Sequence, residues 1–174
     1  MSLLVTRRLL IAVMAVLLAV VSGCGLRPAP VERAGANVFS VGECVVIPSS
    51  APATLRASRG SCAADPSYTI GAIANESAAC PSNEYQHLPT QFADPSTARL
   101  CLVPNLVAEH CYVLDLPIGV VQRAECTDRS QTGLLVQVTQ RLDVRDQQAC
   151  NSGVGQYAWP YPSPPRTYCT LTVF

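Results

Sequence analysis

Lysine is absent from this sequence, and its 12 arginines are matched by 12 acidic residues. Residues 24–174 contain 10 arginines against 12 acidic residues, because Arg7 and Arg8 precede this range, so their side-chain net charge is −2. A chain with so little positive charge forms no polybasic surface, which argues against electrostatic binding of nucleic acid or anionic lipid. We therefore expect no nucleic-acid partner.

Familiar catalytic motifs are missing as well. The sequence has no G-x-S-x-G and no H-E-x-x-H motif. His87 and His110 are the only histidines, and without a motif around them each is interpreted as a solvent-facing or hydrogen-bonded residue. A weak cation site at Glu109, His110 and Asp115 is discounted, because alternation along a strand places the first two on opposite faces. Gly153–Gly155 is too short for a phosphate loop and is interpreted as the end of a helix. We expect no enzyme activity, cofactor or metal.

No apolar run in the chain is long enough to cross a membrane. The longest, Leu9–Val21, has 13 residues, whereas a spanning helix needs about 20. It follows Arg7 and Arg8 and leads into Ser22-Gly23-Cys24, so it has the charged start, apolar centre and small-residue cleavage site of a signal peptide. A plain secretory signal is the competing interpretation, but it would leave the position of Cys24, directly after Ser22-Gly23, as a coincidence.

This segment resembles the lipobox of bacterial lipoproteins. The resemblance implies that residues 1–23 are removed and that Cys24 receives a diacylglycerol, which anchors the protein to the outer face of the cell membrane. Residues 24–37 contain two prolines and no apolar periodicity, so we expect the lipidated cysteine to be followed by a flexible tether. The membrane is then a partner through the lipid anchor.

Cysteine is abundant after the tether. The eight remaining cysteines are Cys44, Cys62, Cys80, Cys101, Cys111, Cys126, Cys150 and Cys169. An even number in an exported protein predicts disulfides, because that side of the membrane is oxidising. A zinc site is disfavoured, since there is no C-x-x-C pair.

The cysteines divide into two sets of four with offsets of 67, 64, 70 and 68 residues, which indicates an internal duplication. We predict a first repeat at 38–106 and a second at 107–174. The strand-like segments Tyr68–Ala74 and Leu134–Thr139 are matched to each other in this alignment.

Each repeat is expected to contain one short helix. Asp143 is the predicted N-cap of a helix over 144–150, and Asn75 that of a helix over 76–80. Each unit then reads strand, strand, strand, helix, strand. The predicted fold class is α+β, a tandem repeat of two small disulfide-bonded units with antiparallel strands.

Cysteine spacing alone leaves three pairings open in each repeat. The favoured pairing joins 44 with 62, 80 with 101, 111 with 126 and 150 with 169. Its basis is that successive short strands are usually neighbours, and that each helix needs fastening to its sheet.

An aromatic and proline-rich segment near the end is the candidate partner-binding site. Tyr157, Trp159 and Tyr161 lie among four prolines, which predicts a stiff, polyproline-like loop that presents rings to a partner or glycan. The competing interpretation, which we favour, is that Trp159 folds back over the core of the second repeat.

The whole of residues 24–174 resembles the LppU-type lipoproteins of actinobacteria. The shared features are the lipobox, a short tether, Gly42-Glu43-Cys44-Val45, the two four-cysteine repeats, and Cys150–Gly155 followed by an aromatic and proline stretch and Tyr168-Cys169. Related repeats often have a histidine after Asp-Pro, where this chain has Asp65-Pro66-Ser67. The resemblance implies an envelope lipoprotein and assigns no activity.

The leading functional hypothesis is a non-catalytic, lipid-anchored envelope protein that binds an envelope protein or polysaccharide. The alternatives are a hydrolase with an unrecognised active site and a carrier of a small apolar ligand or lipid. The first alternative needs a pocket that combines a histidine, a hydroxyl nucleophile and a carboxylate. The second needs a large internal cavity.

Overall fold

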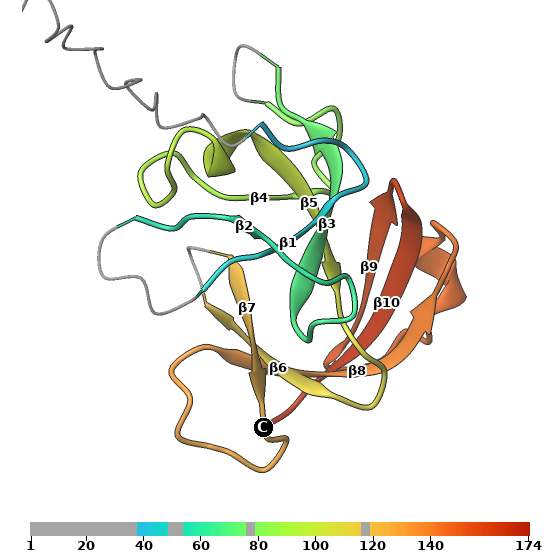
Figure 1. Cartoon of the computed structure of the whole chain (residues 1–174). Coiled ribbons are helices and arrows are strands. Elements are labelled where there is room, and N and C mark those ends of the chain that lie inside the picture. Colours follow the sequence, from blue (N-terminus) through green and yellow to red (C-terminus); the bar gives the residue numbers. More distant parts are fainter. Residues whose placement is uncertain (1–37, 49–53, 76–78, 116–118) are drawn as a thin grey trace, which may run out of the picture. The chain divides into compact units, whose positions relative to one another are not determined.

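The computed structural model describes residues 38–48, 54–75, 79–115 and 119–174, which form two five-stranded antiparallel sheets (Figure 1). The strands of the first sheet are β1 (Cys44–Val46), β2 (Ser58–Arg59), β3 (Ser67–Ile73), β4 (Gln86–His87) and β5 (Leu100–Asn105). Those of the second are β6 (Cys111–Asp115), β7 (Val120–Ala124), β8 (Leu134–Leu142), β9 (Gln156–Pro162) and β10 (Pro165–Thr172). The predicted signal peptide, lipidated cysteine and tether lie outside the described residues.

The predicted α+β class is wrong. The described residues contain no α-helix, and their only helical segments are two single 3₁₀ turns, η2 (Thr97–Arg99) and η3 (Gln147–Ala149). The predicted helix over 144–150 reduces to η3, which begins after Asp146 instead of Asp143. None of its residues is buried, so no apolar face stabilises a longer helix. Residues 76–78 of the other predicted helix lie outside the described part of the chain.

The two sheets have the same strand order. The first runs β2-β1-β3-β5-β4 and the second β7-β6-β8-β10-β9, so each strand of the first sheet has a counterpart five places later in the list. The pairing registers also correspond, because Cys44 faces Thr69 in the first sheet and Cys111 faces Gln137 in the second. An internal duplication accounts for this agreement. The registers show that Tyr68 corresponds to Val136. The sequence alignment of the two repeats matched Tyr68 with Leu134, so it was wrong by two residues.

Each sheet carries a β-bulge at the corresponding position. In β3 the register shifts between Ile70 and Ala72, which leaves Gly71 as the extra residue. In β8 the register shifts opposite Cys169 and Thr170, which leaves Thr139 as the extra residue. Both bulges lie next to the cysteine of the last strand of their sheet, so the bulge is part of the repeated unit.

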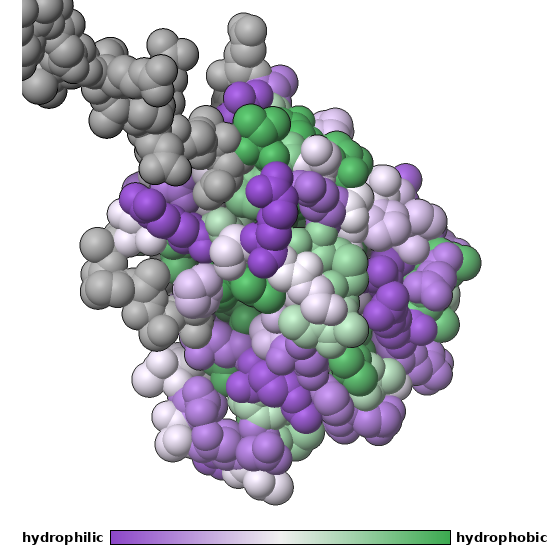
Figure 2. All heavy atoms as spheres, viewed as in Figure 1, coloured by the Kyte–Doolittle hydropathy of each residue, from purple (hydrophilic) through white to green (hydrophobic). Residues whose placement is uncertain are grey.

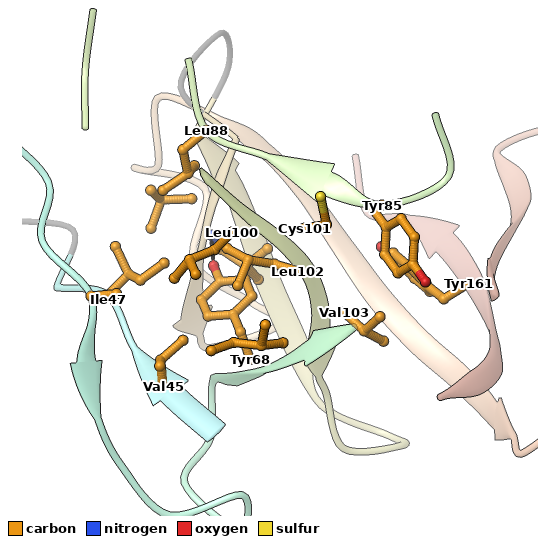
Figure 3. Packing of buried hydrophobic residues seen from close by; sticks show 14 of the residues in the cluster. Val45, Ile47, Tyr68, Tyr85, Leu88, Leu100, Cys101, Leu102, Val103 and Tyr161 are labelled. Atoms are coloured by element: carbon orange, nitrogen blue, oxygen red, sulfur yellow. Dashed lines mark hydrogen bonds between the residues drawn. The ribbon is translucent and has the colours of Figure 1, made fainter. Parts of the chain in front are cut away.

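The larger of two hydrophobic clusters among the described residues joins the two sheets, whereas the sequence suggested one core for each repeat; the smaller cluster, around Cys111, Val113 and Leu135, lies within the second sheet. Alternating side chains of the first sheet, such as Val45 and Ile70, and of the second, such as Val136 and Tyr168, are all fully buried in one cluster. Figure 3 shows part of this cluster, with Tyr161 of the second sheet beside residues of the first. Burying a large apolar side chain contributes about 2 kcal/mol, so the shared core couples the stability of the repeats.

Tyrosine hydroxyls form hydrogen bonds across the boundary between the repeats. Tyr68 of β3 accepts a hydrogen bond from the Val121 backbone N–H at 2.9 Å. Tyr168 of β10 accepts one from the Leu106 N–H at 3.0 Å and donates to the Pro104 carbonyl at 2.7 Å. Both rings are at most 1 % exposed. Burial raises the pKa of Tyr68 to about 12, although the Val121 N–H acts in the opposite direction.

Arg166 reinforces the same boundary from inside the core. It is 7 % exposed, and its Nη1 donates to Asn105 Oδ1 at 2.7 Å and to the Pro104 carbonyl at 3.2 Å. Asn105 in turn accepts a hydrogen bond from the Thr69 hydroxyl at 2.9 Å. Among the described residues Arg166 has no carboxylate partner: its hydrogen bonds go from Nη1 to neutral acceptors, its buried Nε has none, and the centre of the Tyr168 ring lies 5.9 Å from the guanidinium.

Candidate functional site

The disulfides follow the pairing that the sequence favoured. They join Cys44 with Cys62, Cys80 with Cys101, Cys111 with Cys126, and Cys150 with Cys169. In each bridge one cysteine lies on a strand and is at most 6 % exposed, while the other lies in a connecting segment and is more exposed. The bridges thus fasten connections to the sheets. Four disulfides make this a disulfide-rich domain of extracellular type, suited to an oxidising environment.

Cys24, the predicted lipidation site, lies outside the described residues. Among the residues that are described, none belongs to a helix with the length and hydrophobicity needed to cross a membrane.

The segment with the candidate aromatic residues is a strand, so the prediction of a polyproline-like loop is wrong. Residues 156–162 form β9, which pairs with β10 along its whole length. Tyr157 is 54 % exposed, Trp159 is half-buried against the core, and Tyr161 is 6 % exposed and packs edge-on against Tyr168 with ring centroids 6.1 Å apart. Tyr157 is therefore the ring of the three that offers most surface to a partner.

The prolines of β9 are tolerated because it is an edge strand. Pro160 and Pro162 pair with β10 on one side, and no further strand of the sheet follows on the other. Proline has no N–H to donate, so within sheets it is found mainly on edge strands, at the first residue of a strand or at bulges. The same prolines remove donors that would let another chain extend the sheet, which protects this edge against aggregation.

His87 is held by the backbone. Its Nε2 lies 2.6 Å from the carbonyl oxygen of Ala98, the residue before the end of η2, and the side chain is half-buried. This contact fastens β4 to the segment before β5. It supports the interpretation of His87 as a hydrogen-bonded structural residue.

His110 belongs to a polar cluster that sequence reasoning did not find. Its Nδ1 lies 2.6 Å from Asp65 Oδ2, and the other carboxylate oxygen of Asp65 accepts a hydrogen bond from the Tyr112 hydroxyl. Arg123 Nε is 3.4 Å from the same carboxylate, and its guanidinium lies over the Tyr112 ring. Asp65 comes from the first repeat and the other three from the second. Only the folded arrangement brings them together, since Asp65 precedes His110 by 45 residues.

The cluster has part of what an acid–base site requires. Asp65 orients the His110 ring, as a carboxylate does in many hydrolases. The neighbouring hydroxyl, however, is that of Tyr112, which also accepts a hydrogen bond from the Val107 N–H and whose ring is fully buried. Burial and the Asp65 carboxylate raise the pKa of Tyr112 far above its usual range, which keeps it protonated. This geometry favours a cross-repeat contact over a nucleophile site.

No group of three or more His, Cys, Asp or Glu side chains in the described part of the chain could hold a metal ion. Asp65 and His110 supply two such groups, and the remaining members of their cluster are tyrosine and arginine. The glutamate next to His110 and Asp115 do not complete a ligand set.

Two surface hollows differ in chemistry. An apolar groove of about 440 Å³ lies at one end of the first sheet, and its lining residues include Phe39, Ile73, Leu100 and the charged Arg99. Apolar side chains are also visible over this sheet among polar ones in Figure 2. A smaller cleft of about 240 Å³ lies on the second sheet, and we call it the amide cleft. Its lining residues are Thr139, Gln140, Asn151, Gln156, Cys169 and Thr170.

Comparison of the chain with family models, curated proteins and solved structures gives no match.

Proposed function

We propose that this chain is a lipid-anchored, non-catalytic envelope lipoprotein of the LppU type, whose duplicated domain binds an envelope protein or polysaccharide. The observation that carries the proposal is the set of four disulfides, each fastening a connection to a buried strand. Such a domain presents a surface that is already ordered before a partner arrives, which lowers the entropic cost of binding. The lipobox-like Ser22-Gly23-Cys24 supplies the anchor.

Anchoring is tested by expressing the full chain in an actinobacterial host and separating membrane from soluble fractions. We expect the protein in the membrane fraction, with the mass of residues 24–174 plus a diacylglycerol. Cys24→Ala should release it or leave the signal peptide attached, whereas Ser22→Ala, which keeps a small residue before the cysteine, should not. An unacylated protein with a free Cys24 thiol would refute the anchored form.

Partner binding is tested by cross-linking in intact cells and recovery of the full chain. Tyr157→Ala is the informative variant, because this ring is exposed and its loss leaves the core intact. Gln148→Ala, an exposed change on η3, serves as the control. Recovery of one envelope component by the wild type and the Gln148→Ala control, and of less of it by Tyr157→Ala, supports the proposal. Recovery of none by any of the three contradicts it.

A further inference from the structure

The two bulges occupy corresponding places but have different surroundings. In the first sheet the turn between β9 and β10 covers the bulge, so closely that a Cβ added to Gly71 would lie 2.1 Å from the Ser163 carbonyl oxygen and 2.4 Å from the Tyr85 ring. Only glycine permits this approach. The first repeat thus receives a turn from the second at its bulge, and the residues around it are mostly buried.

The corresponding place in the second sheet is the amide cleft. Thr139 replaces Gly71 as the extra residue of the bulge, and Gln140 replaces Ala72 beside it. On the edge strand, Gln156 stands where the first repeat has Tyr85, the residue before β4. No described segment covers this bulge, and Gln140, Asn151 and Gln156 are exposed. Duplication has therefore given one covered apolar site and one polar site that faces solvent.

The side chains of the amide cleft have hydrogen-bonding capacity to spare. Each amide of Gln140, Asn151 and Gln156 offers one acceptor oxygen and two N–H donors. Among the described residues, the polar contact of these amide groups is that of Gln140 Oε1 with Cys169 Sγ at 3.8 Å, and this disulfide sulfur has no proton to donate, so the three amides have no nitrogen or oxygen partner. Thr139 and Thr170 direct their hydroxyls to backbone carbonyls, which holds the wall of the cleft in place.

The chemistry of the cleft points to a neutral, polyhydroxylated ligand. No arginine, aspartate or glutamate lines it, so nothing in the lining selects a charged group. Its lining also lacks the large apolar side chains that form the centre of protein interfaces. Amides that both donate and accept suit neighbouring hydroxyl groups, which also do both.

We propose that the amide cleft is a binding subsite for a neutral saccharide unit of an envelope polysaccharide. This inference rests on the proposed function and narrows it to one ligand class and one place. Gln140 of β8 lies opposite Cys169 of β10, and Gln156 of β9 lies opposite Leu171, so the two amides flank β10 from opposite sides and contact the sugar hydroxyls.

The test uses the full-length protein purified in detergent and neutral tetrasaccharides of glucose, mannose and N-acetylglucosamine as probes. Binding is followed by NMR of ¹⁵N-labelled protein, in which the side-chain amide signals of Gln140, Asn151 and Gln156 report the site. The double variant Gln140→Ala/Gln156→Ala should lower the affinity at least about tenfold. Gln148→Ala, an exposed amide outside the cleft lining, should leave it unchanged. Circular dichroism and disulfide mapping confirm that both variants fold.

Three results would overturn the inference: no neutral tetrasaccharide binds, the double variant binds as well as wild type, or a peptide copying residues 161–166 shifts the cleft signals while the saccharides do not. The last result would mean that this bulge, like the first, receives a protein turn. If cells still anchor the protein and the double variant still recovers the same envelope component, the inference fails and the proposed function stands. If anchoring and recovery fail, the proposed function itself is wrong.

Discussion

The two repeats share a strand order and a bulge, yet they differ in what the bulge contacts. In the first repeat Gly71 lies under the Ser163 turn, and in the second Thr139 borders a polar cleft. A second difference is the residue that directly precedes the first strand of each repeat. It is Glu43 before β1 and His110 before β6, and each follows a turn. Glu43 contacts Arg59 of its own repeat, whereas His110 contacts Asp65 of the other. The comparison teaches that two units with the same strand order share one large hydrophobic cluster and yet present different chemistry at corresponding places.

The largest effect is expected from the disulfides. Replacing Cys80 and Cys101 with alanine should lower the free energy of unfolding by about 4 kcal/mol, because the bridge closes a long loop and Cys101 lies in the shared core. The same change at Cys150 and Cys169 should cost about 3 kcal/mol, since this bridge lies outside that core. Chemical denaturation of both variants measures the difference. Equal losses would mean that core burial adds nothing to loop closure.

The bulges give the next prediction. Gly71→Ala should destabilise the protein by about 3 kcal/mol, because the added Cβ would clash with the carbonyl oxygen of Ser163. This oxygen is a backbone atom, so it cannot move away as the end of a flexible side chain could. Thr139→Ala at the corresponding place should cost less than about 1 kcal/mol, the value of its hydrogen bond to the Cys169 carbonyl. Thermal unfolding of the two variants measures both losses of stability. Equal losses would contradict the difference proposed between the two bulges.

The cross-repeat cluster should contribute less. Asp65→Ala removes the acceptor for Tyr112 and His110, and we expect a loss of about 2 kcal/mol. Glu43→Ala is the matched control, because its ion pair with Arg59 is exposed and stays within the first repeat, so it should destabilise the protein less than Asp65→Ala does. Urea denaturation at pH 7 compares them. A larger loss for Glu43→Ala would contradict the role given to the boundary.

The connections before the last strand give the smallest effect. In the first repeat, the connection between β4 and β5 contains Asp94, which accepts hydrogen bonds from Ser96 and Thr97. In the second repeat, a tight turn joins the corresponding strands β9 and β10. Burial alone would raise the pKa of Asp94, but these hydrogen bonds prevail and lower it. A carboxyl whose pKa is lower folded than unfolded stabilises the protein above its unfolded value, near 4, and this contribution is lost as pH falls through the folded value.

This pH dependence is checked by measuring unfolding from pH 7 to pH 2 for wild type and Asp94→Asn. The variant should lose about 1 kcal/mol at pH 7, and the gap between the two proteins should narrow as the pH falls below about 4. A gap that stayed constant down to pH 2 would show that the Asp94 charge plays no part.

Cysteine positions carried most of the structural information in the sequence. Their nearly constant offset indicated the duplication, and neighbouring short strands indicated the pairing that the disulfides have. The helix prediction was wrong because Asp143 is a good cap by type, but the residues after it bury no apolar face. The strand β9 was missed because its prolines suggested a loop, and only the edge position makes them compatible with pairing.

The candidate sites were harder to predict than the fold. Asp65 and His110 meet only because the repeats share one core, and nothing local to either residue signals this contact. The amide cleft is likewise invisible in sequence, since Gln140 and Gln156 come from different strands and are brought together by the bulge and the pairing of β8, β10 and β9. A strand alignment of the two repeats at the correct register would have placed Thr139 opposite Gly71 and drawn attention to it.

The central claim is that both repeats form one core and unfold together. Differential scanning calorimetry of the full-length protein, with its disulfides intact, tests this most directly. The shared cluster predicts a single transition whose calorimetric and van't Hoff enthalpies agree. Two resolved transitions, or a calorimetric enthalpy about twice the van't Hoff value, would contradict it and return the repeats to independent units.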